Sequence, residues 1–200
     1  MTTTWRFFHK MNKTITTILL FLTFVCYSQD NVVPLENTSQ HNPFETPKLY
    51  YKDVNNVLDK FIGTWRYQDN AVNPTKVFEI TFSKRKRRDV GNVNYTDELI
   101  SQFSYIVNGV TVYDTYVGDK YYYITGSTLL SDTNNTKMQL FYTEPIIDGR
   151  TLRENPRSDL FIDFQTVSGS PTLNWYNKAE LDQNNNSPFR IPLLMTLNKI

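Results

Sequence analysis

The sequence contains few of the side chains from which most catalytic and metal sites are built. Its 200 residues include one cysteine, Cys26, two histidines and seven glycines. A single cysteine forms no disulfide within the chain, and it is too few for a cysteine-ligated zinc site. The sequence also has no glycine-rich phosphate-binding loop. A fold built from this chain must therefore be held together by its hydrophobic core alone.

The first 28 residues have the order of charge and hydrophobicity of an export signal. Lys10 and Lys13 precede an apolar run over residues 15–25, and the small residue Ser28 follows that run. The run is shorter than the about 20 residues that a membrane-spanning helix needs. We therefore predict cleavage after Ser28, a true start at Met11, and a secreted or periplasmic mature protein with no transmembrane span.

A lipoprotein signal is the alternative interpretation of the same segment. In that case Cys26 would carry the lipid and anchor the mature chain to a membrane. Lipidation favours a small residue directly before the cysteine, and Val25 is not small. We therefore favour the freely soluble product over the lipid-anchored one.

Cleavage would change the chemistry of the chain. Three of the 21 basic residues and none of the 20 acidic residues precede residue 29, so the mature chain would carry 18 bases, 20 acids and a net charge of −2. That balance creates no field that attracts nucleic acid. The one histidine left, His41, lies in a polar, proline-containing segment over residues 29–49, which we predict to be an extended tether.

This position of the histidine excludes several kinds of catalytic site. A general base needs a fixed position and a partner, and a solvated tether gives His41 neither. A Ser-His-Asp triad and a multi-histidine metal site are excluded, so we expect no cofactor, no metal and no enzymatic activity. Four carboxylates lie on or beside predicted strands, and we expect each to face solvent. They are Asp97, Glu98, Asp114 and Asp163.

Residues 50–200 are predicted to form one all-β domain. Asp53 can cap a short helix that ends at Gly63, and apolar and polar residues alternate from there onward. Asn108-Gly109 and Gly118-Asp119 are typical of two-residue hairpin turns. The predicted strands begin near residues 63 and 76 and continue over residues 99–107, 110–117, 120–125, 137–143, 159–166, 172–177 and 191–199. An antiparallel meander of about eight or nine strands follows, closed into a barrel or, alternatively, packed as a β-sandwich.

The start of this meander resembles a known family. Gly63-Thr64-Trp65 resembles the glycine-x-tryptophan motif on the first strand of lipocalins. The resemblance implies a lipocalin-like barrel in which Gly63 allows close backbone approach and Trp65 plugs the closed end. It also implies a basic residue over the indole, for which Arg190 is the candidate. Residues 50–65 and 192–199 are similar to an uncharacterised family of small secreted bacterial proteins, which implies no activity.

The sharpest charge feature is the basic run over residues 84–88, Lys-Arg-Lys-Arg-Arg. Alone, such a run could bind nucleic acid or an anionic surface. It extends a predicted strand, and its like charges repel one another. We therefore predict that it forms the solvated tip of a hairpin.

The aromatic residues give the remaining hint of function. Tyrosine combines a wide apolar face with a polar tip, so it suits a cavity that binds a small apolar or amphipathic ligand. The candidate lining residues fall in one meander and are Phe103, Tyr105, Tyr113, Tyr121 and Tyr123. The sequence thus favours a binding module with a ligand inside the barrel. The alternative is a structural or interaction protein of the cell envelope whose barrel is filled by side chains.

Overall fold

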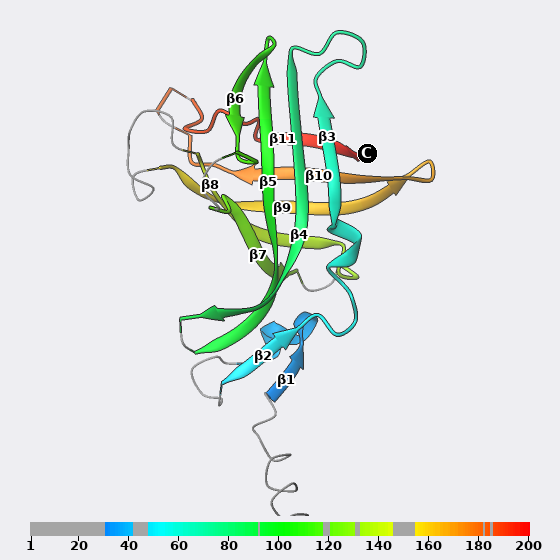
Figure 1. Ribbon diagram of the computed structural model, residues 1–200, viewed down its shortest axis with the longest axis vertical. Helices are drawn as coiled ribbons and strands as arrows, with labels where there is room; N and C mark the ends of the chain where they lie inside the picture. The colour runs from blue at the N-terminus through cyan, green and yellow to red at the C-terminus, as the bar shows by residue number, and fades with distance from the viewer. Residues whose placement is uncertain are drawn as a thin grey trace, which may run out of the picture.

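The computed structural model describes residues 31–41, 48–91, 93–117, 121–130, 133–145, 155–181, 183–184 and 186–200. The predicted export signal lies outside these residues. The described parts are strands with two short 3-10 helices (Figure 1). The elements are β1 (Asn31–Pro34), η1 (Leu35–Gln40), β2 (Leu49–Lys52), η2 (Asp59–Phe61), β3 (Gly63–Gln68), β4 (Lys76–Val90), β5 (Asn94–Val107), β6 (Val110–Asp114), β7 (Ile124–Leu129), β8 (Lys137–Thr143), β9 (Arg157–Val167), β10 (Ser170–Lys178) and β11 (Leu194–Lys199).

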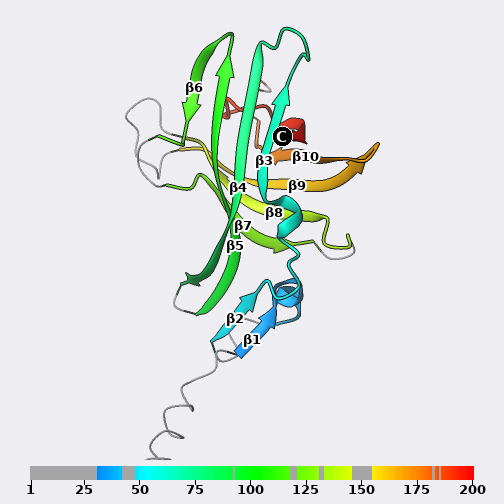
Figure 2. The ribbon, with the colours of Figure 1, turned by 45° about the vertical axis from the view of Figure 1, so that its right-hand side comes forward.

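Eight of the strands form a closed antiparallel barrel, which confirms the predicted all-β barrel. The order around it is β5-β4-β3-β11-β10-β9-β8-β7, and β7 returns to β5. The barrel closes through two short contacts, in which Leu99 pairs with Gly126 and Lys199 pairs with Trp65. In Figure 1 the wall of β9 and β10 runs across and behind the upright β4 and β5. Figure 2 shows the same crossing from the side.

The first predicted hairpin is confirmed, whereas the turn of the second lies outside the described residues. Asn108 and Gly109 both have positive φ, 50° and 78°, between the paired residues Val107 and Val110. The second predicted turn includes residues 118–120, which lie outside the described residues. In the described part, β6 pairs with β5, whereas β7 pairs with β5 and β8. Strands β6 and β7 therefore follow each other along one edge of β5.

The N-terminal segment, residues 31–58, contains more regular structure than a tether. Strand β1 pairs with β2 in parallel, and β2 pairs in parallel with β5. Leu35 at the start of η1 is only 1% exposed. Figure 1 shows this segment against the lower ends of β4 and β5. The parallel partner of β2, strand β5, lies about 45 residues further along the chain. Such pairing leaves no local periodicity in the sequence, so the sequence pattern did not predict β2.

The predicted short helix is a turn followed by η2. Asn56 has φ of 54°, a left-handed conformation that interrupts a helix. The Asp53 carboxylate accepts hydrogen bonds from the backbone N–H groups of Val57 (2.7 Å) and Leu58 (3.3 Å), so it caps the turn instead. The predicted apolar face survives, because Leu58 and Phe61 are fully buried.

Trp65, the tryptophan of the motif on which the lipocalin resemblance depends, lies on β3, the strand that follows η2. Its side chain is fully buried on β3, and its indole N–H donates to the Phe61 carbonyl at 2.8 Å. The cation over the indole is Lys199, with Nζ 5.2 Å from the ring centre, and not the expected Arg190. Lys199 lies there because it pairs directly with Trp65 across β3 and β11. Gly63 has φ of 118°, and a Cβ on it would lie 3.0 Å from the Lys199 side chain.

Replacement of Trp65 by alanine should lower the free energy of unfolding by about 3–5 kcal/mol, because it removes a fully buried ring and leaves a cavity. Urea denaturation monitored by circular dichroism measures the effect. Val110→Ala is the control, since Val110 is 67% exposed and its truncation should change stability by less than about 0.5 kcal/mol. Equal effects of the two substitutions would contradict the role of Trp65 as the plug.

Candidate functional site

Large side chains fill the interior of the barrel. Phe78 lies near its centre, with its ring centre 5.4 Å from Phe103, 6.3 Å from Tyr105 and 5.3 Å from Trp175. Each of these residues is at most 2% exposed. Rings in such contacts pack edge to face or tilted, which stabilises a core beyond the burial of area alone.

The structure divides the five aromatic residues that were predicted to bind a ligand. Phe103, Tyr105 and Tyr113 are at most 4% exposed and belong to the hydrophobic core. Tyr121 is 37% exposed and lies edge to face against the partly buried Tyr123, at 4.9 Å between ring centres. None of the five lines the trough or the pocket described below.

The outer wall over β8–β11 carries an open trough of about 790 Å³. Strand register places two parallel rows of outward-facing side chains across these four strands. One row is polar and consists of Thr196, Asn174, Asp163 and Lys137. The other row, which we call the apolar row, has three apolar side chains and one amide. It consists of Leu194, Tyr176, Phe161 and Gln139.

Two apolar side chains of this row are largely exposed to solvent. Leu194 is 69% exposed and Tyr176 is 49% exposed. The rings of Phe161 and Tyr176 lie nearly parallel, with 6.1 Å between their centres and 23° between their planes. Two neighbouring strands thus carry a stacked pair of aromatic rings at the surface, of which Tyr176 is exposed and Phe161 is half-buried. Exposed aromatic groups of this kind are typical of binding surfaces.

The polar row beside them is internally hydrogen-bonded and has no net charge. The Thr196 hydroxyl donates to Oδ1 of Asn174 at 3.1 Å, and Lys137 lies 3.5 Å from Asp163. Gln165 also donates to Asp163, at 3.2 Å. The trough therefore offers amide, hydroxyl and charged groups along one side and aromatic and aliphatic side chains along the other. A sequence pattern alone could not align them, because the alignment depends on the register between the four strands.

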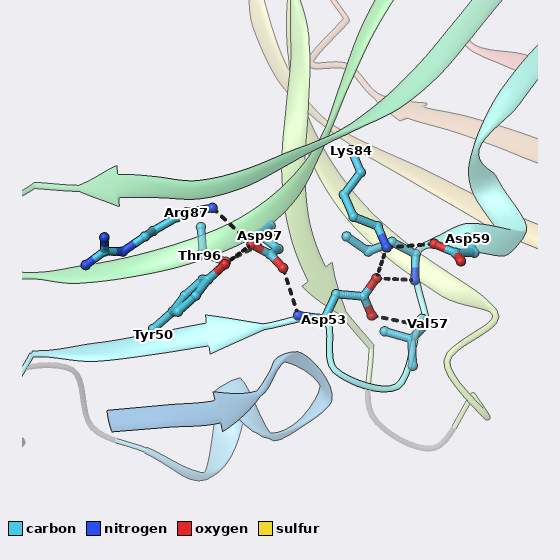
Figure 3. Close-up of polar contacts among 9 residues, drawn as sticks. Tyr50, Asp53, Val57, Asp59, Lys84, Arg87, Thr96 and Asp97 are labelled. Carbon is cyan, nitrogen blue, oxygen red and sulfur yellow. Dashed lines mark hydrogen bonds and ion pairs between the residues drawn. The ribbon is translucent and has the colours of Figure 1, made fainter. Parts of the chain in front are cut away.

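The basic run is not a solvated hairpin tip. Residues 84–88 lie within β4, and carboxylates of other elements pair with three of them. Lys84 contacts Asp53 and Asp59, each at 2.6 Å (Figure 3). Arg85 and Arg88 both contact Glu98 on β5. The predicted repulsion is therefore offset by acids that are remote in sequence.

A β-bulge explains how two arginines reach one carboxylate. Residues three apart in a regular strand point to opposite faces. The register between β4 and β5 shifts between Arg85 and Arg88, and Arg87 within the shift has φ of 52°. Glu98 is 1% exposed and accepts from Nε of Arg85 at 2.7 Å and from Nη1 of Arg88 at 2.6 Å.

The bulge also connects the N-terminal segment to the barrel. Asp97, only 2% exposed, accepts hydrogen bonds from the Arg87 backbone N–H (2.9 Å), the Tyr50 hydroxyl (2.6 Å) and the Asp53 backbone N–H (3.1 Å) (Figure 3). The expectation that Asp97 and Glu98 face solvent is therefore wrong. We call the set formed by Asp53, Lys84, Asp97 and Glu98 with its partners the polar clamp.

The other expected solvent-facing carboxylates lie apart from the polar clamp. Asp163 lines the trough, and Asp114 accepts from the Tyr116 backbone N–H. In the described part of the chain, no three histidine, cysteine or acidic side chains are placed to hold a metal ion. His41 is half-buried beside Tyr51, at 6.3 Å between ring centres, and so is not a solvated linker residue. Within the same residues, no helix is long and apolar enough to cross a membrane.

Comparison with known proteins places the chain in a family. A model of the family of unknown function DUF6705 matches residues 10–178. The chain belongs to this family. No curated protein and no solved structure matches it. The DUF6705 assignment agrees with the expected likeness to an uncharacterised family and brings no activity, so the argument for function depends on the surfaces described above.

Replacement of Glu98 by glutamine should lower the free energy of unfolding by about 2–3 kcal/mol, because two guanidinium groups would lose the carboxylate between them. Glu79→Gln is the matched control. Glu79 pairs with Arg66 at 2.6 Å but is 29% exposed, so its loss should cost less than about 1 kcal/mol. Urea midpoints of both variants measure these losses. A loss of stability in Glu98→Gln no larger than that in Glu79→Gln would contradict the stabilising role of the polar clamp.

The protein should lose stability in strongly alkaline solution. Burial, together with the neighbouring Glu144, raises the pKa of Tyr142 well above its ordinary value of 10.0. For Lys84, burial lowers the pKa, but hydrogen bonds to Asp53 and Asp59 outweigh that effect and raise it above 10.5. Both groups keep their protons in the folded state where the unfolded chain releases them. Their stabilisation is therefore complete below about pH 10 and declines as the pH rises further.

Urea midpoints measured between about pH 8 and pH 11 test this expectation. The midpoint should fall above about pH 10, and Tyr142→Phe should reduce that fall because phenylalanine does not titrate. A midpoint that stays constant over the whole range would contradict the burial of these two protonated groups.

Proposed function

We propose that the protein is an exported, non-enzymatic binding module that holds a neutral glycan chain in the trough over β8–β11. The observation that carries the proposal is the stacking of the half-buried Phe161 ring on the exposed Tyr176 ring beside a hydrogen-bonding row. Sugar rings have apolar C–H faces that stack on aromatic rings, and hydroxyl groups at their edges that bond to polar side chains.

The charge and length of the trough favour this class of ligand. Lys137 and Asp163 are paired, so the trough lining has no net charge to attract a polyanion or a polycation. Neighbouring strands lie about 4.8 Å apart, and each row extends over four of them. The rows therefore suit an extended chain of several rings more than a single small molecule.

The filled interior of the barrel favours a binding site on its outer surface over a ligand cavity inside it. The aromatic residues that could have lined a cavity contact one another, as Phe78 and Phe103 do at 5.4 Å. Of the two functions that the sequence left open, the protein with a filled barrel and a binding surface outside it therefore fits better. The basic, apolar and small residues that end at Ser28 support export.

Affinity electrophoresis tests the proposal. The mature protein should be retarded in native gels that contain at least one of four neutral polysaccharides: laminarin, xylan, galactomannan or dextran. Tyr176→Ala should weaken that retardation about tenfold, equivalent to about 1.4 kcal/mol. Because Tyr176 is half-exposed, its truncation should leave the unfolding midpoint nearly unchanged.

Tyr121→Ala is the matched control, since Tyr121 is also partly exposed but lies away from the trough. It should bind as the parent protein does. Retardation by none of the four polysaccharides would contradict the proposal. Loss of binding in Tyr121→Ala but not in Tyr176→Ala would move the site to the Tyr121–Tyr123 cluster. Binding of an extended apolar peptide in place of any polysaccharide would assign the trough to a protein partner.

A further inference from the structure

A second hollow, separate from the trough, lies where the N-terminal segment meets the barrel. It is a pocket of about 260 Å³, lined by η1, β2, β4, β5, β7 and β8. Its apolar walls include Tyr51, Val90 and Phe141, and its polar side includes Arg88 and Glu98. The volume lies just below the usual range of ligand pockets, about 300–1,000 Å³. It therefore suits a molecule of one ring or less.

The charged cluster that borders this pocket has a net positive charge. Glu98 is the acid there, and both of its oxygens are already engaged, Oε1 by Arg85 and Oε2 by Arg88. One negative charge thus faces two guanidinium groups. Asp97, the next residue along β5, hydrogen-bonds elsewhere, to Tyr50 and to the backbone of Arg87. Arg85 does not line the pocket, so the uncompensated positive charge belongs to the cluster of Arg85, Arg88 and Glu98 beside it.

Arg88 is the group through which this charge can act. Its side chain is 42% exposed, and only its Nη1 bonds to Glu98. Among the described residues, Nε and Nη2 of Arg88 have no hydrogen-bond partner. A guanidinium with two free donor nitrogens can hold a planar carboxylate by two parallel bonds. The bulge at Arg87 keeps Arg88 on the side of Glu98 and of the pocket.

Neutral hydrogen-bonding groups complete the lining. The hydroxyls of Thr96 and Ser127 lie 3.2 Å apart, and both residues line the pocket. Burial raises the pKa of Tyr51, so its phenol stays protonated and can donate. His41, beside Tyr51, is the other titratable group on the N-terminal side. The pocket therefore joins one cationic fork to several neutral polar groups and two aromatic walls.

We propose that this pocket binds a small organic monoanion through a carboxylate on Arg88, with the ligand's ring against Tyr51 and Phe141. A monoanion fits because the cluster of Arg85, Arg88 and Glu98 has one more positive than negative charge, and a ring fits because Tyr51 and Phe141 line the same pocket. Such a ligand contacts both the N-terminal segment and the barrel. Its binding therefore stabilises the docking of β2 on β5, which the hydrogen bonds of Asp97 to Tyr50 and to the Asp53 backbone also hold.

Isothermal titration calorimetry at low ionic strength tests this site with two matched pairs of probes. Benzoate and D-glucuronate carry the carboxylate, whereas benzamide and D-glucose are their neutral counterparts. At least one of the two carboxylates should bind, and its neutral counterpart should bind at least about tenfold more weakly. Equal binding of both members of each pair, or binding by none of the four, would overturn the proposal.

Substitutions locate the binding on Arg88. Arg88→Gln should weaken carboxylate binding about tenfold or more, and Arg88→Lys, which keeps the charge but not the fork, should fall between. Arg66→Gln is the matched control, because Arg66 is also 42% exposed and pairs with a glutamate. The Arg66→Gln variant should bind the carboxylate as tightly as the parent protein does. Equal losses in Arg66→Gln and Arg88→Gln would contradict the assignment.

Hydrogen exchange separates a specific site from a general effect on the fold. Since Arg85 still pairs with Glu98 in Arg88→Gln, that variant should fold, which its circular dichroism and unfolding midpoint will show. Saturating carboxylate should slow exchange of the β2 amides in the parent protein and not in Arg88→Gln. Slowing of exchange in both proteins would place the ligand elsewhere and overturn the proposal.

Discussion

The whole structure depends on closing a barrel with very little backbone pairing at its two joins. Strand β11 meets β3, and β5 meets β7, over two residue pairs each. No disulfide is available to hold these joins, so side-chain packing must do it. The fully buried Trp65 lies at one join, with Lys199 over its ring. A barrel stabilised in this way needs a filled interior, and binding surfaces are then left to its outside.

Much of the fold follows from local patterns in the sequence. Alternating apolar residues predict the barrel strands, because one face of each is buried. Asn108-Gly109 predicts its turn, because both residues must adopt positive φ. A three-residue motif is enough to single out Trp65, which is fully buried on β3. The parallel strands β1 and β2 could not be predicted, since their partners lie far along the chain and they have no pattern of their own.

The candidate sites were harder to predict, for physical reasons. The basic run looks self-repelling in sequence, and only the fold brings Asp53, Asp59 and Glu98 against it. A bulge, which leaves no mark in the sequence, turns Arg85 and Arg88 to the same side. The trough depends on the register of four strands, so neither Tyr176 nor Asn174 could be assigned to it from alternation alone.

The polar nature of the clamp has a consequence for the order in which the protein assembles. A chain is made from its N-terminus, so the N-terminal segment exists before the β4–β5 hairpin on which it docks. Asp53 lies 31 residues before its partner Lys84, and Asp97 lies further on. Until that hairpin forms, Asp53 has no Lys84 to pair with, and Tyr50 has no Asp97 to which it can donate. The N-terminal segment, although made first, can therefore dock only after β4 and β5 have come together.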